Sequence, residues 1–345
     1  IFVEYSYRAV KGNSSGHSFT KRIMLFQAGN NFLNHDGYFT YVPNAKIRSL
    51  GLFSTQNPKL KHDIKIEYDY VIRTNNAGLV MQTDLIPSDR VLFVIGDSFT
   101  EGQGASAWFY DLEEDYNVPP IKPVNLGILG TGPQQWENLS KSVSKQFDLT
   151  VEGSVVNIIP DDMNRGIWTF QETELNCLAH ISCDYNFGFQ GYDFKLQETD
   201  EDIKLSVLQT LTENKLLPAD ENSSTALIKQ YVKRSHVVFD LHNAYTMNFR
   251  RYNPLPNQDS LIALKKAVAD NFYVNVVSMK TVNSANFLSY RFARELIGFL
   301  EKNDIKYSWC DIPDSGYHII DGHPNDEGYK VLRSCTEDAL AKLIK

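Results

Sequence analysis

The chain has 345 residues, of which 42% are hydrophobic and 22% are charged, so it has the composition of a globular protein and ample length for a large core. The formal net charge is -8 and basic residues form no long run, which argues against a nucleic acid as partner. No stretch is long and apolar enough to span a bilayer.

The N-terminal part, residues 1–60, mixes glycine, asparagine and serine clusters with short apolar pieces. We expect it to form an extension of loops and short strands that packs on a main domain over residues 61–345. The sequence opens at Ile1 without a methionine, so we expect it to be processed or an excerpt, with room for a signal peptide or a membrane anchor outside the given chain.

A half-buried strand is predicted over residues 64–73, because apolar or aromatic residues there alternate with mostly charged ones. The next residues, 74–78, have the asparagine and glycine content of a turn.

The most informative stretch is VLFVIGDSFTEGQG, residues 91–104. Its apolar residues 91–95 predict a buried strand of a parallel sheet, after which Gly96 and Asp97 turn the chain. Ser98 would then stand at the carboxyl edge of the sheet, near backbone N–H groups that favour a developing negative charge. Such a serine can be a nucleophile if a base reaches it, and His323 near the end of the chain offers that base.

Strands and helices alternate through the rest of the chain. A short strand from residue 124 runs into a glycine-rich loop that contains Gly130, and Pro324 suits the first turn of a last helix that runs to the C-terminus. The alternation predicts a doubly wound α/β fold with a mostly parallel sheet. Further helices are predicted over residues 108–115, 136–147 and 287–300, and further strands over residues 154–159, 272–279 and 305–310.

An insertion is expected around residues 166–253, where the alternation pauses. It contains a cluster of aromatic residues over 185–194 and a predicted long helix over residues 223–249. The aromatic residues could form a platform for sugar rings, but we favour the simpler interpretation that they fill a small satellite core.

The four cysteines leave two interpretations open. Cys177 and Cys183 are close enough in sequence to close a small loop, whereas Cys310 ends a predicted strand and Cys335 lies on the last helix. Two disulfides in this pairing would fit an exported, periplasmic or extracellular protein, which we favour over four free thiols in a cytosolic enzyme. No histidine or cysteine spacing predicts a metal site, and no cofactor is expected.

Two blocks of this sequence resemble those of the SGNH/GDSL hydrolases, a family of serine esterases and acyl-transferring enzymes, in its bacterial exported type. The first block reads Gly96-Asp97-Ser98 with Gly102 close behind, and the last reads Asp321-Gly322-His323-Pro324-Asn325 with Gly328. The resemblance covers the chain from about Ile64 to its end. It implies a flavodoxin-like three-layer α/β/α sandwich.

The resemblance also implies roles for individual residues. Ser98 would be the nucleophile, His323 the base that takes its proton, and Asp321 the acid that orients the imidazole ring. The backbone N–H groups of Ser98 and Gly130 would hold the oxyanion. Asp97 is expected to fix the turn and Arg165 to pair with a carboxylate.

The third block departs from the family pattern, because Asp161 stands where an oxyanion-binding asparagine is expected. A carboxylate cannot donate a hydrogen bond unless it is protonated. Three solutions are open: a neutral Asp161, an amide from Asn164 or Asn157, or an oxyanion hole built only from the N–H groups of Ser98 and Gly130. Losing one donor typically lowers turnover by on the order of 100-fold.

We therefore expect a serine esterase that removes acyl groups, above all acetyl, from a carbohydrate or a small ester. One alternative is a polysaccharide O-acyltransferase that uses the same residues with a sugar hydroxyl in place of water. Another is a catalytically degenerate carbohydrate-binding module, which Asp161 would fit. His318 is close to the site in sequence, but we expect it to be a surface-loop histidine.

Overall fold

The computed structural model describes residues 18–27, 31–56, 62–105, 108–116, 121–167, 195–213, 256–268 and 271–344. Most of the insertion expected around residues 166–253 lies outside these ranges. Its two cysteines, its aromatic cluster and its predicted helix over 223–249 all fall there.

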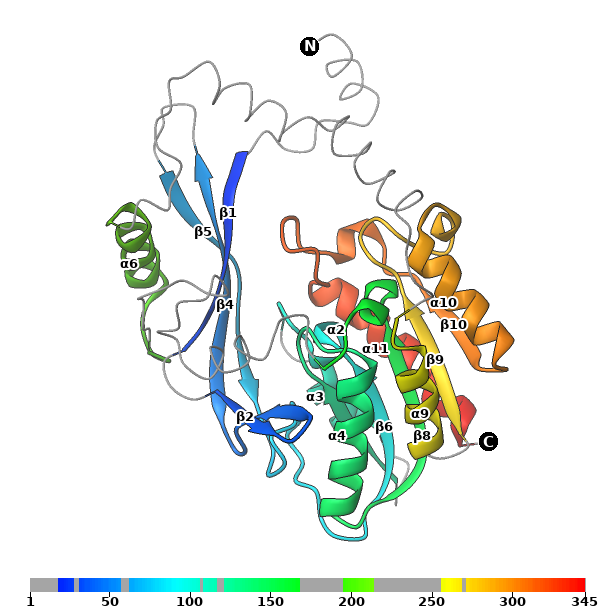
Figure 1. Ribbon diagram of the computed structural model, residues 1–345. Coiled ribbons are helices and arrows are strands. Elements are labelled where there is room, and N and C mark those ends of the chain that lie inside the picture. Colours follow the sequence, from blue (N-terminus) through cyan, green and yellow to red (C-terminus); the bar gives the residue numbers. More distant parts are fainter. Residues whose placement is uncertain are drawn as a thin grey trace.

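A parallel five-stranded sheet forms the centre of the molecule (Figure 1), with the strand order β10-β9-β8-β6-β7. Numbered along the chain from β6 as first strand, the order is 2-1-3-4-5, which is that of the flavodoxin-like fold. The α/β fold class is thereby confirmed. The strands are β6 (Arg90–Gly96), β7 (Ile121–Gly127), β8 (Thr150–Ile158), β9 (Phe272–Val277) and β10 (Lys306–Cys310).

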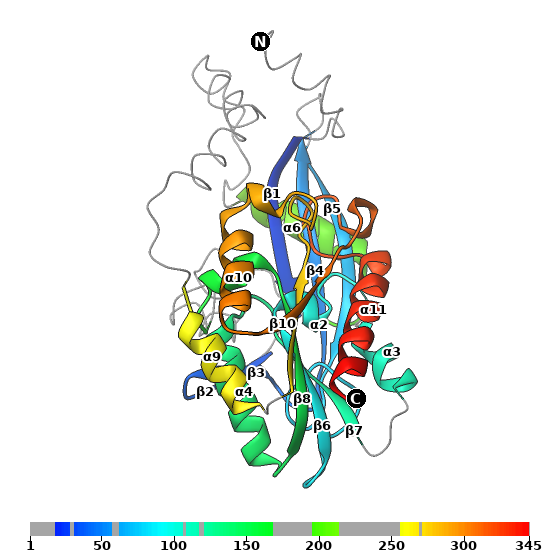
Figure 2. The same cartoon turned by 90° about the vertical axis from the view of Figure 1, so that its right-hand side faces the viewer.

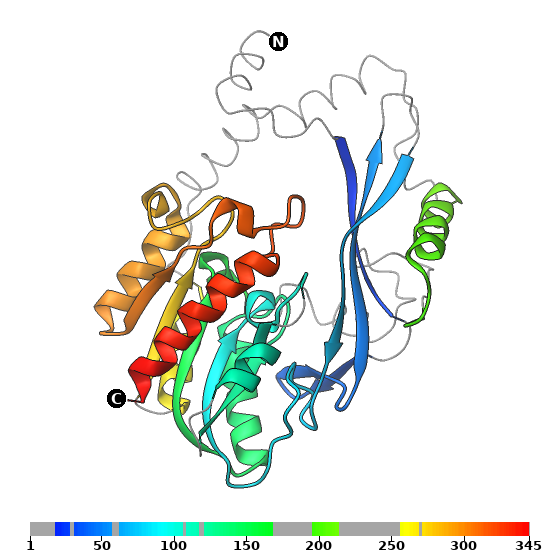
Figure 3. The ribbon, with the colours of Figure 1, turned by 180° about the vertical axis from the view of Figure 1, so that it is seen from behind.

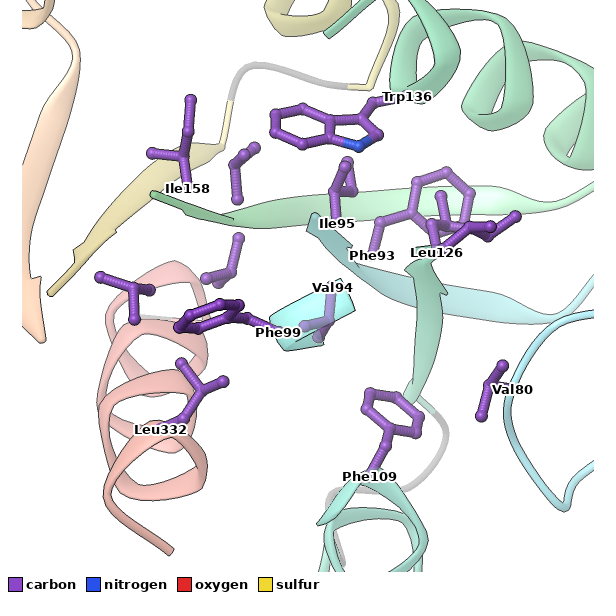
Figure 4. Close-up of a cluster of buried hydrophobic side chains, with 14 of the residues drawn as sticks. Val80, Phe93, Val94, Ile95, Phe99, Phe109, Leu126, Trp136, Ile158 and Leu332 are labelled. Atoms are coloured by element: carbon purple, nitrogen blue, oxygen red, sulfur yellow. The ribbon is translucent and has the colours of Figure 1, made fainter. Parts of the chain in front are cut away.

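Helices cover both faces of this sheet, which makes it the middle of three layers (Figure 2). Figure 4 shows Trp136 and Ile95 packed on one side of the strands, and Val94, Phe99 and Leu332 on the other. Burial on both faces explains why β6 reads as a continuous apolar run. One layer contains α4 (Pro133–Gln146), α9 (Gln258–Ala267) and α10 (Arg291–Lys302), and the other contains α3 (Trp108–Asp115) and α11 (Asp326–Leu343).

Three helix starts differ from prediction. Helix α4 begins at Pro133, before the predicted start at residue 136. Pro324 does not lie in the first turn of α11, because Asn325 caps the helix by accepting the N–H groups of Glu327 and Gly328. Helix α10 starts at Arg291, not at residue 287, since residues 287–289 form the separate 3-10 turn η2 (Phe287–Ser289). Two further short turns are η1 (Pro160–Asn164) and η3 (Asp314–Gly316).

The N-terminal part forms a second sheet beside the first. Strands β1 (Ser18–Phe26), β4 (Lys46–Gln56) and β5 (His62–Arg73) pair antiparallel in the order β1-β4-β5. Strand β4 ends before residue 60 and β5 begins after it, and the two strands pair with each other. A domain boundary at residue 60 would therefore separate two neighbouring strands of one sheet. The domain boundary itself stays a prediction. A small hairpin, β2 (Phe32–His35) with β3 (Tyr38–Tyr41), accompanies this sheet.

Helix α6 (Asp200–Glu213) covers the side of this second sheet that faces away from the five-stranded sheet (Figure 3). Its buried residues Ile203, Val207 and Leu211 pack with Leu50 and Ile64 in a small separate core. Arg48 adds an ionic clamp to Asp69 on β5 and to Asp200 on α6. The sheet is therefore held on its outer face by this helix.

A β-bulge interrupts β5 at Glu67. Tyr68 is opposite Gly51 on β4, but the next partner, Leu52, is opposite Ile66, so that Glu67 is the extra residue. A bulge changes which face the following side chains occupy. As a result Ile64 faces α6, whereas Tyr68 belongs to the main core between the two sheets.

A disulfide joins Cys310 at the end of β10 to Cys335 on α11, which confirms one of the two predicted pairings. Over the part of the chain that the structure describes, no helix has the length and apolar character needed to cross a membrane.

Replacing both bonded cysteines, in Cys310→Ala with Cys335→Ala, should lower the free energy of unfolding by about 3 kcal/mol, because the bond closes a loop over a sequence separation of 25 residues. Urea unfolding checks this. As the control, the wild type and the double variant should unfold at the same urea concentration when both are under reducing conditions. A double variant as stable as the oxidised wild type would contradict the prediction.

Candidate active site

Ser98 lies at the carboxyl end of β6, as predicted, and opens the short helix α2 (Ser98–Glu101). Its side chain is buried in a site where the chain has turned sharply. Asp97 fixes this turn by accepting the N–H of Phe99 at 2.9 Å. Strand β6 is bordered by β7 on one side and β8 on the other, so Ser98 stands at the topological switch point of the sheet, where α/β folds place their ligands.

Ser98 and His323 meet across 225 residues of sequence, with 2.9 Å between Oγ and Nε2. The other ring nitrogen, Nδ1, lies 2.8 Å from Oδ2 of Asp321. A neutral imidazole that donates Nδ1–H to the carboxylate has Nε2 left as an acceptor for the serine hydroxyl. The structure thus brings the three predicted residues into one hydrogen-bonded chain. A longer contact of 3.3 Å joins Ser98 Oγ to Oδ2 of Asp97.

The spacing of two residues between Asp321 and His323 works because of the residue between them. Gly322 has a φ of 78°, in the left-handed region that favours glycine. The resulting tight turn lets the imidazole fold back onto the carboxylate. The Asp321 side chain is only 1% exposed, against 15% for His323, so the acid is buried below the ring.

Arg165 bridges two buried carboxylates beneath the serine turn. Its Nη1 lies 2.6 Å from Oδ2 of Asp97 and 2.7 Å from Oδ1 of Asp162. Burial opposes the charge of Arg165, but these two carboxylates outweigh it and raise the pKa of the guanidinium. The predicted roles of Asp97 in the turn and of Arg165 as a carboxylate partner are both confirmed.

The residues considered for an oxyanion hole lie in different settings. The Ser98 N–H belongs to the first turn of a helix, where N–H groups have no intrahelical acceptor. Gly130 lies in the loop between β7 and α4 with a φ of 67°. Asp161 accepts a hydrogen bond from the Tyr290 hydroxyl, and Asn164 is exposed at the end of η1.

Asn157 is held elsewhere. Its Nδ2 donates to Oγ1 of Thr336 on α11 at 3.2 Å, and its Oδ1 accepts from Nδ2 of Asn275 on β9 at 2.9 Å. The side chain is 1% exposed between these elements. It therefore serves the interior of the fold, which argues against the idea that its amide completes an oxyanion hole.

Glu101 is a buried acid that sequence reasoning missed, although it lies in the same block as Ser98. Its Oε2 accepts the N–H of Leu129 at 2.5 Å, directly before Gly130, and the Tyr70 hydroxyl is 3.5 Å from Oε1. Burial raises the pKa of Glu101 to about 8. This carboxyl ties helix α2 to the loop that presents Gly130.

The supports of Asp321 were also missed. The Tyr68 hydroxyl donates to Asp321 Oδ2 at 2.6 Å, and Gln103 Nε2 lies 3.4 Å from the same oxygen. Glu67 accepts the backbone N–H groups of Ile320 and Asp321 at 2.6 and 2.9 Å. The only local signal was the alternating pattern of residues 64–73, which predicts a strand but does not indicate that its side chains contact Asp321.

The expectation of a surface-loop histidine at position 318 is wrong. His318 is half-buried, with Nε2 2.7 Å from the carbonyl oxygen of Gly104 and its ring 5.2 Å from that of Tyr68. The side chain joins the loop before Asp321 to the end of the serine block. In the described ranges no group of three or more His, Cys, Asp or Glu residues could hold a metal ion.

No protein-family model and no curated protein sequence matches this chain. One similar solved structure is a member of the lipolytic G-D-S-L family from Veillonella parvula, with 12% sequence identity over 73% of this chain and 99% of that chain and a TM-score of 0.33. A carbohydrate acetylesterase family member from Sinorhizobium meliloti has 10% identity over 74% of this chain and 98% of its own, with a TM-score of 0.32. A mutant of an acetylxylan esterase from Geobacillus stearothermophilus has 12% identity over 74% of this chain and 96% of its own, with a TM-score of 0.34. The first is described as a lipolytic G-D-S-L protein, and the other two are described as acetylesterases. At such TM-scores they carry no argument about substrate, and the fold class rests on the strand order.

Glu101→Gln should flatten the dependence of stability on pH. With a pKa of about 8 in the folded protein and an ordinary value of 4.5, the folded state keeps a proton that the unfolded state has lost between these values. Rising pH therefore destabilises the wild type, by at most about 1.4 kcal/mol per pH unit from this group. Urea unfolding at several pH values measures the slope. The exposed Glu114→Gln is the control, and equal slopes in all three proteins would refute the assignment.

Arg165→Met should lower the free energy of unfolding by about 3 kcal/mol, because it leaves two buried carboxylates without their cation. The matched control is Arg90→Met, which breaks a solvent-exposed pair with Glu152 and should cost less than about 1 kcal/mol. Chemical denaturation of both variants gives the comparison. Equal losses of unfolding free energy in the two variants would contradict the prediction that Arg165 stabilises the fold by pairing with buried carboxylates.

Proposed function

We propose that the protein is a serine esterase that removes acyl groups, above all acetyl, from a carbohydrate or a small ester. The observation that carries the proposal is the hydrogen-bonded chain from Ser98 through His323 to Asp321 at the switch point of the sheet. The choice of acetyl and carbohydrate comes from the resemblance of the motif blocks to exported SGNH enzymes.

The geometry supports the following course of reaction. Asp321 holds the Nδ1–H tautomer, and His323 Nε2 takes the hydroxyl proton as Ser98 Oγ forms a bond to the ester carbonyl carbon. The C–O bond to the alcohol then breaks, and the imidazolium returns the proton to the leaving oxygen. Water attacks the acyl-serine in the second half, with His323 again as base, and releases the carboxylic acid.

We assign the oxyanion to the backbone N–H groups of Ser98 and Gly130. Glu101 supports this arrangement, because its bond to the Leu129 N–H fixes the chain one residue before Gly130. One oxygen of Asp161 accepts a hydrogen bond from the Tyr290 hydroxyl, so we give Asp161 no part in the oxyanion hole. We expect an oxyanion hole with two donors to give slower turnover than one with three, since one donor is worth on the order of 100-fold in turnover. Arg165 offsets the negative charge of Asp97 beside Ser98.

Two other functions use the same site. A polysaccharide O-acyltransferase would have a sugar hydroxyl attack the acyl-serine in place of water. A degenerate carbohydrate-binding module would fit Asp161, but the intact hydrogen-bonded chain favours catalysis. We also propose export to the periplasm or the cell exterior, which the disulfide between Cys310 and Cys335 supports.

Ser98→Ala should lower the hydrolysis of p-nitrophenyl acetate by at least about 1,000-fold, because the nucleophile is gone while the fold stays intact. The exposed Ser289→Ala is the matched control and should keep wild-type turnover. Spectrophotometric release of nitrophenolate measures both.

A fluorophosphonate that labels the wild type but not Ser98→Ala would separate either enzyme from a binding module. Acetate release from an acetylated oligosaccharide would favour the esterase, and acetyl transfer to a second oligosaccharide the transferase. A wild type that neither labels at Ser98 nor turns over more than the variant would overturn the proposed function.

A further inference from the structure

The bulge of β5 places two consecutive side chains against the acid of the site. Regular alternation would send Glu67 and Tyr68 to opposite faces of the strand. With Glu67 as the extra residue, both contact the segment that contains Asp321. Bulges often occur next to active sites, where they redirect a side chain. We infer that this bulge positions Asp321, and through it His323, for the chemistry of Ser98. The inference deepens the proposed esterase function and rests on it.

Glu67 fixes the backbone of the segment. Its two carboxylate oxygens accept separate N–H groups, Oε1 from Ile320 and Oε2 from Asp321. Charged acceptors form shorter and stronger hydrogen bonds than neutral ones. The chain is thus held at two successive residues immediately before the Gly322 turn.

Tyr68 fixes the side chain of the same acid. Three donors converge on Asp321 Oδ2: the Tyr68 hydroxyl at 2.6 Å, His323 Nδ1 at 2.8 Å and Gln103 Nε2 at 3.4 Å. Gln103 also donates to the Tyr68 oxygen at 3.0 Å, which keeps the hydroxyl hydrogen directed at the carboxylate. Tyr68, on strand β5 of the second sheet, therefore fixes the position of Asp321 Oδ2, the oxygen that orients the imidazole.

Gly51 gives the Tyr68 ring its position. It is the partner of Tyr68 on β4, and a Cβ added at Gly51 would lie 2.2 Å from Cζ of the ring. The ring thus lies directly over the backbone of β4. A methyl group at this position would move the ring and its hydroxyl away from Asp321.

These contacts make Glu67 and Tyr68 positioning residues, because they act on Ser98 only through Asp321 and His323. A purely structural role would predict a loss of stability with unchanged turnover per folded molecule. Positioning predicts a lower kcat at unchanged KM, since the substrate would touch neither residue.

The test is Tyr68→Phe, which keeps the ring and removes one donor. Its matched control is Tyr38→Phe, which removes a hydroxyl that also bonds at 2.6 Å, to Ser142 on α4, and so also joins the N-terminal part to the α/β domain. We expect kcat for p-nitrophenyl acetate to fall roughly tenfold in Tyr68→Phe, with KM unchanged and the control at wild-type rate. Gly51→Ala should give the same loss. Equal kcat values for Tyr68→Phe and Tyr38→Phe would overturn the inference.

A second readout keeps the inference separate from the proposed function. The ring 15N resonances of His323 report its tautomer whether or not the protein turns over an ester. The Nδ1–H tautomer should dominate in the wild type and in Tyr38→Phe, and its share should fall in a Glu67→Gln, Tyr68→Phe double variant. An inactive wild type whose tautomer responds in this way would refute the esterase and retain the positioning. A tautomer that is the same in all three proteins would refute the positioning.

Discussion

A carboxylate that is buried away from water needs hydrogen-bond donors from the protein. The burial of Asp321 is therefore the constraint on which the arrangement of the surrounding elements depends. Burying such a charge without partners would cost several kcal/mol. The donors come from places far apart in sequence: His323 from the last block, Gln103 from the serine block and Tyr68 from β5. Each is held in turn by the element that contains it. The second sheet and the α/β sandwich are thus joined at the site.

The sheet order determines where such a site can form. The chain passes from β6 through α3 to β7 on one side and then from β7 through α4 to β8 on the other side of β6, which puts the carboxyl end of β6, with Ser98, at the switch point. Buried carboxyl groups near the serine then find partners locally: Arg165 contacts Asp97 and Asp162, and Glu101 accepts the N–H of Leu129. The reacting serine therefore lies among carboxyl groups that already have hydrogen-bond partners.

Local signals in the sequence predicted β5, the strands of the five-stranded sheet, the serine turn and the last block, because an apolar run and its turn are set by neighbouring residues. The long strands β1 and β4 were expected only as loops and short strands. Asn325 was not foreseen as the cap of α11, since Pro324 was assigned to the first helical turn, where proline is favoured. Tyr68 and Glu67 could not be assigned, because their partners are about 250 residues away and their directions depend on a one-residue bulge. His318 was misjudged for a related reason: only tertiary packing brings Gly104 to its ring.

The disulfide between Cys310 and Cys335 encloses both Asp321 and His323 in one covalent ring. A protease that cut the exposed residues 314–315 would open the polypeptide but would not release helix α11, since the sulfur bridge still joins the two pieces. The base and the acid would then stay on the same fragment, tethered to β10. In a reducing compartment the same cut would leave the fragment held only by non-covalent packing, in which Leu332, Ala339 and Leu340 are buried. The oxidised bridge therefore keeps a nicked chain one covalent molecule.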